Sequence, residues 1–147
     1  MHIVIFPFAK KLHNGKTNPK NYPHWTELIA LLLNNNHSIT QIGIEGEEQL
    51  VPDFRKNLSL TELAETINQC DIWIGVDSFG QHFCWDLGKS GIVLWGQSNP
   101  KIFGHPENIN LLKGEQYLMK DQFLMWELVP YRNDVFVEPE EVLKWLR

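Results

Sequence analysis

Short, uninterrupted apolar runs alternate along this chain with segments in which apolar residues recur every three or four positions. Runs rich in β-branched and aromatic residues are typical of strands that are covered on both faces. The runs predict four strands and a fifth, shorter one: His2–Phe8, Ser38–Gly46, Asp71–Val76, Gly91–Trp95 and Asn108–Leu112. The sequence therefore predicts a sheet that is buried from both sides.

Segments of helical spacing lie between these runs and at the end of the chain. They predict helices over residues 24–33, 59–69, 81–87 and 138–147. Ser59 followed by Glu62 is the signature of a capping box at the start of the second helix, and Gly88 suits a left-handed cap at the end of the third. The stretch Ala9–Pro23 holds two prolines, a glycine and three asparagines, which predicts a long loop.

Strands that alternate with helices predict an α/β fold with right-handed crossovers. We expect a single Rossmann-like three-layer domain over residues 1–147, with a mostly parallel sheet. In such folds, ligands bind beyond the carboxyl ends of the strands. The loops expected to carry a site are therefore residues 7–23, 45–48, 77–82 and 96–100.

Composition narrows the class of protein. With 43% hydrophobic and 21% charged residues, the chain is typical of a soluble globular protein. We find no apolar run long enough to span a bilayer and no signal-peptide pattern at the start. The two cysteines lack CxxC spacing, which favours reduced thiols in the cytoplasm, and the six histidines show no metal-ligand spacing. We expect no metal and no resident cofactor.

The charge is unevenly distributed. The net charge of −5 argues against binding to nucleic acid. Before Glu27, however, the chain carries lysines and no acidic residue; the lysines are Lys10, Lys11, Lys16 and Lys20. A local basic pocket on an acidic protein suits a small anionic ligand. A solvated lysine-rich loop is the alternative explanation.

The most polar cluster follows the predicted strand Asp71–Val76. Asp77 and Ser78 are typical helix caps, and a helix start there would also present free N–H groups to a phosphate. Gly80 would let the backbone approach a ligand closely. His82 could donate a hydrogen bond to the same anion, or bond to a backbone carbonyl in a purely structural role.

These residues resemble a known family. The order CDIWIGVDS…H…LGK…IVLWGQSNP is similar to the C-terminal half of glycosyltransferase family 9, the heptosyltransferases of GT-B fold. The segments FPFAKK, PKNYPHWTELIALL and IGIEGEEQL resemble upstream segments of the family in the same order, so the resemblance covers about residues 2–106. The matching positions are Asp77, Ser78, His82, Leu87, Gly88, Lys89, Gly96 and Pro100.

The resemblance implies one half of a GT-B fold that binds the nucleotide part of a nucleotide-sugar. It places Lys20 at the phosphates, Glu45 or Glu48 at the ribose hydroxyls, and Asp77, Ser78 and His82 at the diphosphate. With Lys10, Gly80 and Gly96, these residues form the expected ligand-binding set, and we expect Lys20, Glu45 and Asp77 to share one cavity. The aromatic residues that could cover a base, or pack in the core, are Phe6, Phe8, Trp95 and Phe103.

The chain departs from the family in three respects. Phe79 stands where the family has Gly after Asp-Ser, and Ser90-Gly91 follows Lys89 in place of Pro. A GT-B enzyme also has two such domains, and the resemblance places this chain at the second. The acceptor site and the catalytic base belong to the first domain, which makes enzyme activity uncertain.

Three functions remain open. The first is binding, as in a sequestering protein, of a nucleotide-diphosphate ligand such as a nucleotide-sugar or an ADP-ribose-type molecule without turnover. A homodimer could close a second wall over this ligand. The second is the donor-binding subunit of a family 9 glycosyltransferase with a partner acceptor domain. The third is a small hydrolase in which Asp77 or Glu48 acts with His82, and no nucleophile motif supports it.

Overall fold

The computed structural model describes residues 1–146, and its six strands form one parallel sheet in the order β3-β2-β1-β4-β5-β6. The strands are β1 (His2–Phe6), β2 (Ser38–Gly43), β3 (Phe54–Lys56), β4 (Ile72–Val76), β5 (Ile92–Trp95) and β6 (Ile109–Leu112). Every neighbouring pair is parallel. The order reverses direction between β1 and β4, as in Rossmann folds. The predicted parallel α/β fold is confirmed.

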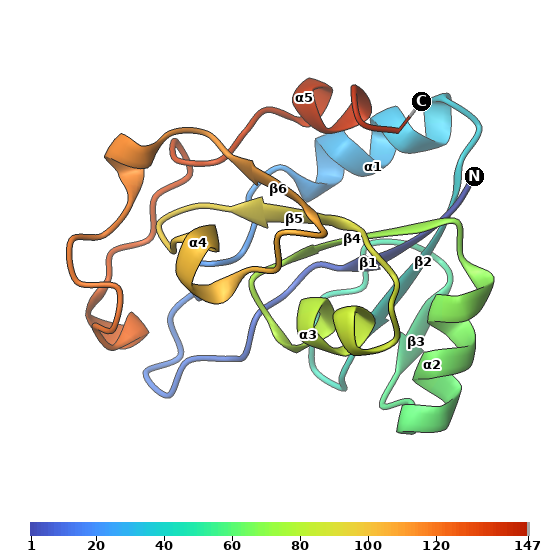
Figure 1. The fold of residues 1–147 in the computed structure, drawn as a ribbon. Coiled ribbons are helices and arrows are strands. Elements are labelled where there is room, and N and C mark those ends of the chain that lie inside the picture. The colour runs from blue at the N-terminus through green and yellow to red at the C-terminus, as the bar shows by residue number, and fades with distance from the viewer. Residues whose placement is uncertain (147) are drawn as a thin grey trace.

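Helices cover both faces of the sheet (Figure 1). One face carries α1 (Trp25–Asn34) and α5 (Pro139–Leu143); the other carries α2 (Leu60–Gln69) and α3 (Phe79–Asp86). A short helix, α4 (Pro100–Phe103), follows β5, and single 3₁₀ turns cover Glu115–Tyr117 and Trp126–Leu128.

Successive residues of β1 point into different cores. Ile3 and Ile5 pack with α1, whereas Val4 and Phe6 pack with α2. Because side chains alternate across a strand, a run that is apolar at every position needs helices on both sides. The uninterrupted apolar runs thus explain the three layers.

Two local signals predicted from the sequence are confirmed. Ser59 Oγ accepts a hydrogen bond from the Glu62 backbone N–H, and the Glu62 carboxylate accepts one from the Ser59 N–H. At the end of α3, Gly88 has φ +75° and Lys89 N–H donates to the Cys84 carbonyl, which completes a Schellman motif.

Other expectations were wrong in detail. The strand β3 was not predicted, because three residues at a sheet edge are too few to show a period. Helix α3 begins at Phe79 rather than Gln81, and its N-cap, Ser78, makes no side-chain capping bond. The final helix was predicted to reach Arg147, which lies outside the described residues, and α5 ends at Leu143.

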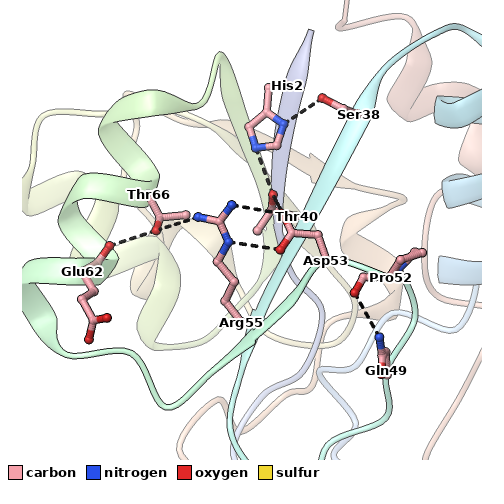
Figure 2. Close-up of polar contacts among 9 residues, drawn as sticks. All are labelled: His2, Ser38, Thr40, Gln49, Pro52, Asp53, Arg55, Glu62 and Thr66. Carbon is pink, nitrogen blue, oxygen red and sulfur yellow. Dashed lines mark hydrogen bonds and ion pairs between the residues drawn. The ribbon is translucent and has the colours of Figure 1, made fainter.

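A polar network joins β1, β2 and the edge strand β3 to α2 on the amino-terminal side of the sheet (Figure 2). Thr40 Oγ1 donates to Asp53 Oδ2 at 2.7 Å and lies 3.0 Å from His2 Nε2. Arg55 donates to both oxygens of Asp53 and to Thr66 on α2. These bonds fix the short strand β3 to its neighbours, at the side of the sheet away from the loops expected to bind a ligand.

Candidate functional site

The main cavity lies beyond the carboxyl ends of β1, β2 and β4 and has a volume of about 580 Å³. Phe6 and Phe8 line it from the end of β1, Ile42 from β2, and Asp77 and Ser78 from the end of β4. Since β1 and β4 flank the point where the strand order reverses, the cavity occupies the position at which doubly wound sheets bind ligands.

An ion pair lies in the wall of this cavity. Lys20 Nζ is 3.2 Å from Asp77 Oδ2, and the Asp77 side chain is almost fully buried. Asp77 Oδ1 accepts a hydrogen bond from Gln81 Nε2 at 2.8 Å. The Lys20 ammonium also lies 4.9 Å from the ring centre of Trp126, within the range of a cation–π interaction.

The loop that carries Lys20 is held by asparagine side chains. Asn18 Oδ1 accepts from the Lys20 backbone N–H, and Asn18 Nδ2 donates to the Lys10 carbonyl. Asn21 Oδ1 accepts from the Ala9 N–H. The sequence therefore forms an ordered turn where composition alone predicted only a long loop, and Lys10 and Lys20 both line the cavity.

Residues 119–131 form a strap beside the cavity, with Trp126 and Glu127 in its wall. Its Gln122 side chain donates to the Gln97 carbonyl and accepts from the Asn99 N–H, which ties the strap to the end of β5. Tyr131 Oη donates to the Asn21 carbonyl and so ties it to the lysine loop. The strap brings Trp126 to the cavity wall.

The predicted acidic residues lie next to the main cavity rather than in it. Glu45 and Glu48 line an adjoining cavity of about 380 Å³. Both cavities share Phe8 and Glu47 in their walls. Glu45 also forms an ion pair with Lys56 at 3.2 Å. Of the three residues expected to share a cavity, Lys20 and Asp77 do so, and Glu45 borders the neighbouring one.

The two predicted glycines have packing roles in the structure. A Cβ on Gly80 would lie 2.6 Å from a Phe6 ring atom, although Gly80 itself lines the cavity. A Cβ on Gly96 would lie 2.6 Å from a Phe136 ring atom, and Gly96 lines neither cavity. The glycine at each position lets an aromatic ring approach the backbone.

His82 lines neither cavity and has another histidine as its partner. Its Nδ1 lies 2.8 Å from His105 Nε2, and the His105 ring stacks on Trp85 with ring centres 4.6 Å apart. Burial, together with the nearby charge of His105, lowers the pKa of His82 below its ordinary value. The neutral form of His82 is thereby favoured.

The aromatic candidates divide between cavity and core. Phe6 and Phe8 line the main cavity. Trp95 is fully buried and its indole N–H donates to Asn110 Oδ1, while Phe103 packs edge-on against Phe123 of the strap. Sequence reasoning missed Trp126, because nothing in the irregular segment around it signals contact with a distant lysine.

Within residues 1–146, no group of three or more His, Cys, Asp or Glu side chains is arranged to hold a metal ion. None of the helices in that range has the length and apolarity of a membrane span.

Proteins of known structure share the fold of this chain. Its fold is similar to that of the E. coli ADP-heptose LPS heptosyltransferase II, with a TM-score of 0.67 and 17% identity over 99% of this chain and 45% of that one. It is also similar to TibC from enterotoxigenic E. coli H10407, described as an iron-containing dodecameric glycosyltransferase (TM-score 0.63, 14% identity, 97% of this chain and 38% of that one).

A second TibC structure, in complex with ADP-D-β-D-heptose, gives a TM-score of 0.61 and 13% identity over 97% of this chain and 37% of that one. The chain thus spans less than half the length of these solved structures. No curated protein sequence matches it. The model of glycosyltransferase family 9 (heptosyltransferase) matches residues 2–120, most of the chain. This protein therefore belongs to glycosyltransferase family 9.

Proposed function

We propose that this domain binds a nucleotide-diphosphate ligand, such as a nucleotide-sugar or an ADP-ribose-type molecule, in the main cavity and holds it without turnover. The observation that carries the proposal is a lysine ammonium in an otherwise largely apolar cavity at the point where the strand order reverses. The volume of about 580 Å³ lies within the range of small-molecule sites.

The parts of such a ligand match different parts of the site. The phosphates would lie at Lys20, with Lys10 and the first turn of α3 nearby, since ammonium and backbone N–H groups complement phosphate oxygens. Within residues 1–146, no side-chain hydrogen bond caps the N-terminus of α3. Phe6 and Phe8 would pack against the base, while Glu45 or Glu48 in the adjoining cavity would accept bonds from ribose hydroxyls.

Binding without turnover is supported by the state of the carboxylates. Transfer to an acceptor hydroxyl needs a positioned general base. Asp77 is occupied by Lys20 and Gln81, and the Glu47 carboxylate accepts a bond from the Ile44 N–H. In both side chains one carboxylate oxygen already accepts a hydrogen bond, which favours binding over base catalysis at these two residues. A protein of this kind would sequester its ligand.

The proposal also includes a homodimer that closes a second wall over the cavity, and a location in the cytoplasm. Exposed apolar residues border the cavity or lie on the strap, and a homodimer could cover them; they are Ile44, Leu60, Phe79, Phe123, Met125 and Leu128. Cys70 and Cys84 are free, buried thiols whose pKa values are raised by burial, which suits the reducing cytoplasm.

A donor-binding part of a glycosyltransferase is the second candidate. Membership of family 9 favours it, and the apolar rim of the cavity would suit an acceptor domain as well as a second copy of the chain. In that case the partner domain would supply the base and exclude water from the cleft. His82, Asp77 and Glu48 do not gather in one cavity, so no observation favours a hydrolase.

One experiment separates these candidates. The protein is mixed with ADP- or UDP-linked sugars, starting with the ADP-linked type because TibC was solved with ADP-D-β-D-heptose. The ligand is then followed by chromatography. Binding predicts stoichiometric loss of free ligand and recovery of the intact molecule after heat denaturation. Release of nucleoside diphosphate without an added partner would show catalysis, and no depletion of any nucleotide would contradict both candidates.

A further inference from the structure

The ammonium group of Lys20 already has neighbours on two sides in the absence of ligand. Asp77 Oδ2 lies 3.2 Å from Nζ, and the Trp126 ring centre lies 4.9 Å from it. The Asp77 residue is only 5% exposed. A carboxylate at this distance, shielded from water, cancels much of the positive charge that the lysine offers to the cavity.

The two oxygens of Asp77 are not held equally. Oδ1 accepts a hydrogen bond from Gln81 Nε2, and Gln81 is itself buried. Oδ2 lies near Lys20, yet within the described residues it accepts no directed hydrogen bond. The contact is therefore an ion pair without the directional bond that makes charge-assisted pairs strong. A phosphate oxygen could replace it.

We infer that Asp77 is an internal competitor for Lys20 that lowers the affinity of the site for every anion, an inference that rests on the proposed nucleotide site. Its negative charge opposes any anion at Lys20 by a fixed amount. A ligand whose only anchor is its phosphate cannot overcome that opposition, whereas one that also packs a base against Phe6 and Phe8 can. Asp77 thereby sets a threshold of affinity: bare phosphate and pyrophosphate bind too weakly to occupy the site, while a whole nucleotide retains enough affinity to do so.

The inference reverses the sign expected from the family resemblance. If Asp77 is a ligand contact, removing its charge weakens binding. If Asp77 competes for Lys20, Asp77→Asn strengthens binding, because the amide still accepts from Gln81 but no longer neutralises the lysine.

Calorimetric titration with inorganic pyrophosphate and with ADP tests the inference. Asp77→Asn is expected to bind pyrophosphate about tenfold or more tightly than the unmodified protein, and to bind ADP more tightly as well. The double change Asp77→Asn with Lys20→Met should lose this gain. Glu107 is exposed and lies outside both cavities, so Glu107→Gln removes the same charge from the protein and should leave affinity within about twofold.

The outcomes separate the inference from the proposed function. Unchanged or weaker pyrophosphate binding by Asp77→Asn would overturn the inference, even where ADP binds. Tighter pyrophosphate binding together with no detectable binding of ADP or any other nucleotide would support the inference and contradict the proposed function. Thermal unfolding checks that each variant is folded, and Asp77→Ser, which also removes the charge, replaces the Asn variant if that one does not fold.

Discussion

The ammonium nitrogen of Lys20 lies 4.9 Å from the ring centre of Trp126, although the two residues belong to the first and last quarters of the chain. The strap of residues 119–131 makes this contact possible, because Gln122 and Tyr131 fix it to the end of β5 and to the lysine loop. Lys20 thus links the cavity to a segment whose only regular structure is a single 3₁₀ turn at Trp126–Leu128.

Trp126 should report on ligand binding. An anion that draws Lys20 away changes the charge over the indole, so ADP is expected to alter the intrinsic fluorescence of the protein. Trp126→Phe should abolish most of that change. Trp145→Phe removes an exposed tryptophan that does not line the cavity and should preserve the change. Equal responses from the two variants would place the ligand elsewhere.

Lys20→Met should weaken nucleotide binding. The change removes the cation that the site offers to phosphate, so the dissociation constant for ADP is expected to rise about tenfold or more. Calorimetry measures it, with Lys101→Met as the control, since Lys101 is exposed and pairs with Glu115 outside the cavity. Similar affinities for Lys20→Met and Lys101→Met would show that Lys20 does not bind the phosphate.

Acidification should destabilise the fold through His82. The pKa of His82 lies below its ordinary value of 6.5 in the folded protein, owing to burial and to His105. The unfolded chain takes up this proton near pH 6.5 and the folded protein only at lower pH, so the unfolded state holds more protons in between. The stabilisation is present above pH 6.5 and is lost as the pH falls through the folded pKa.

Urea unfolding at about pH 7.5 and about pH 5 measures this effect. His82→Gln should lose less stability between the two conditions than the unmodified protein. The difference should be modest, because the residue is more than a third exposed. His13→Gln, a change at another exposed histidine, serves as the control. An unchanged pH dependence in His82→Gln would contradict the prediction.

Gly88→Ala should lower the free energy of unfolding by about 1 kcal/mol, because φ is +75° there and a Cβ is strained in that conformation. A Cβ would meet no atom within 4 Å, so the cost is conformational rather than steric. Gly88→Asn should cost less, since Asn tolerates the left-handed region better than Ala. Urea unfolding compares the three proteins; equal midpoints would show that the left-handed cap contributes nothing.

Much of the candidate site could be predicted from the order of elements. Polar residues after β4 and the lysine loop after β1 were expected at the carboxyl edge of a parallel sheet, and Lys20 and Asp77 do lie together there. The partner of His82 could not be predicted. The loop after α4 brings His105 to it, and no local pattern couples the two residues.

The sequence by itself determined the local structure: the capping box of Ser59 and Glu62, the turn at Gly88, and strands apolar on both faces. These features depend on residues only a few positions apart, because the periods of the helix and the strand decide which side such residues face. Only the tertiary structure decided the placement of β3, the position of Trp126 on Lys20 and the pairing of His82 with His105. Those contacts join distant segments, and packing of the whole sheet and its loops selects them.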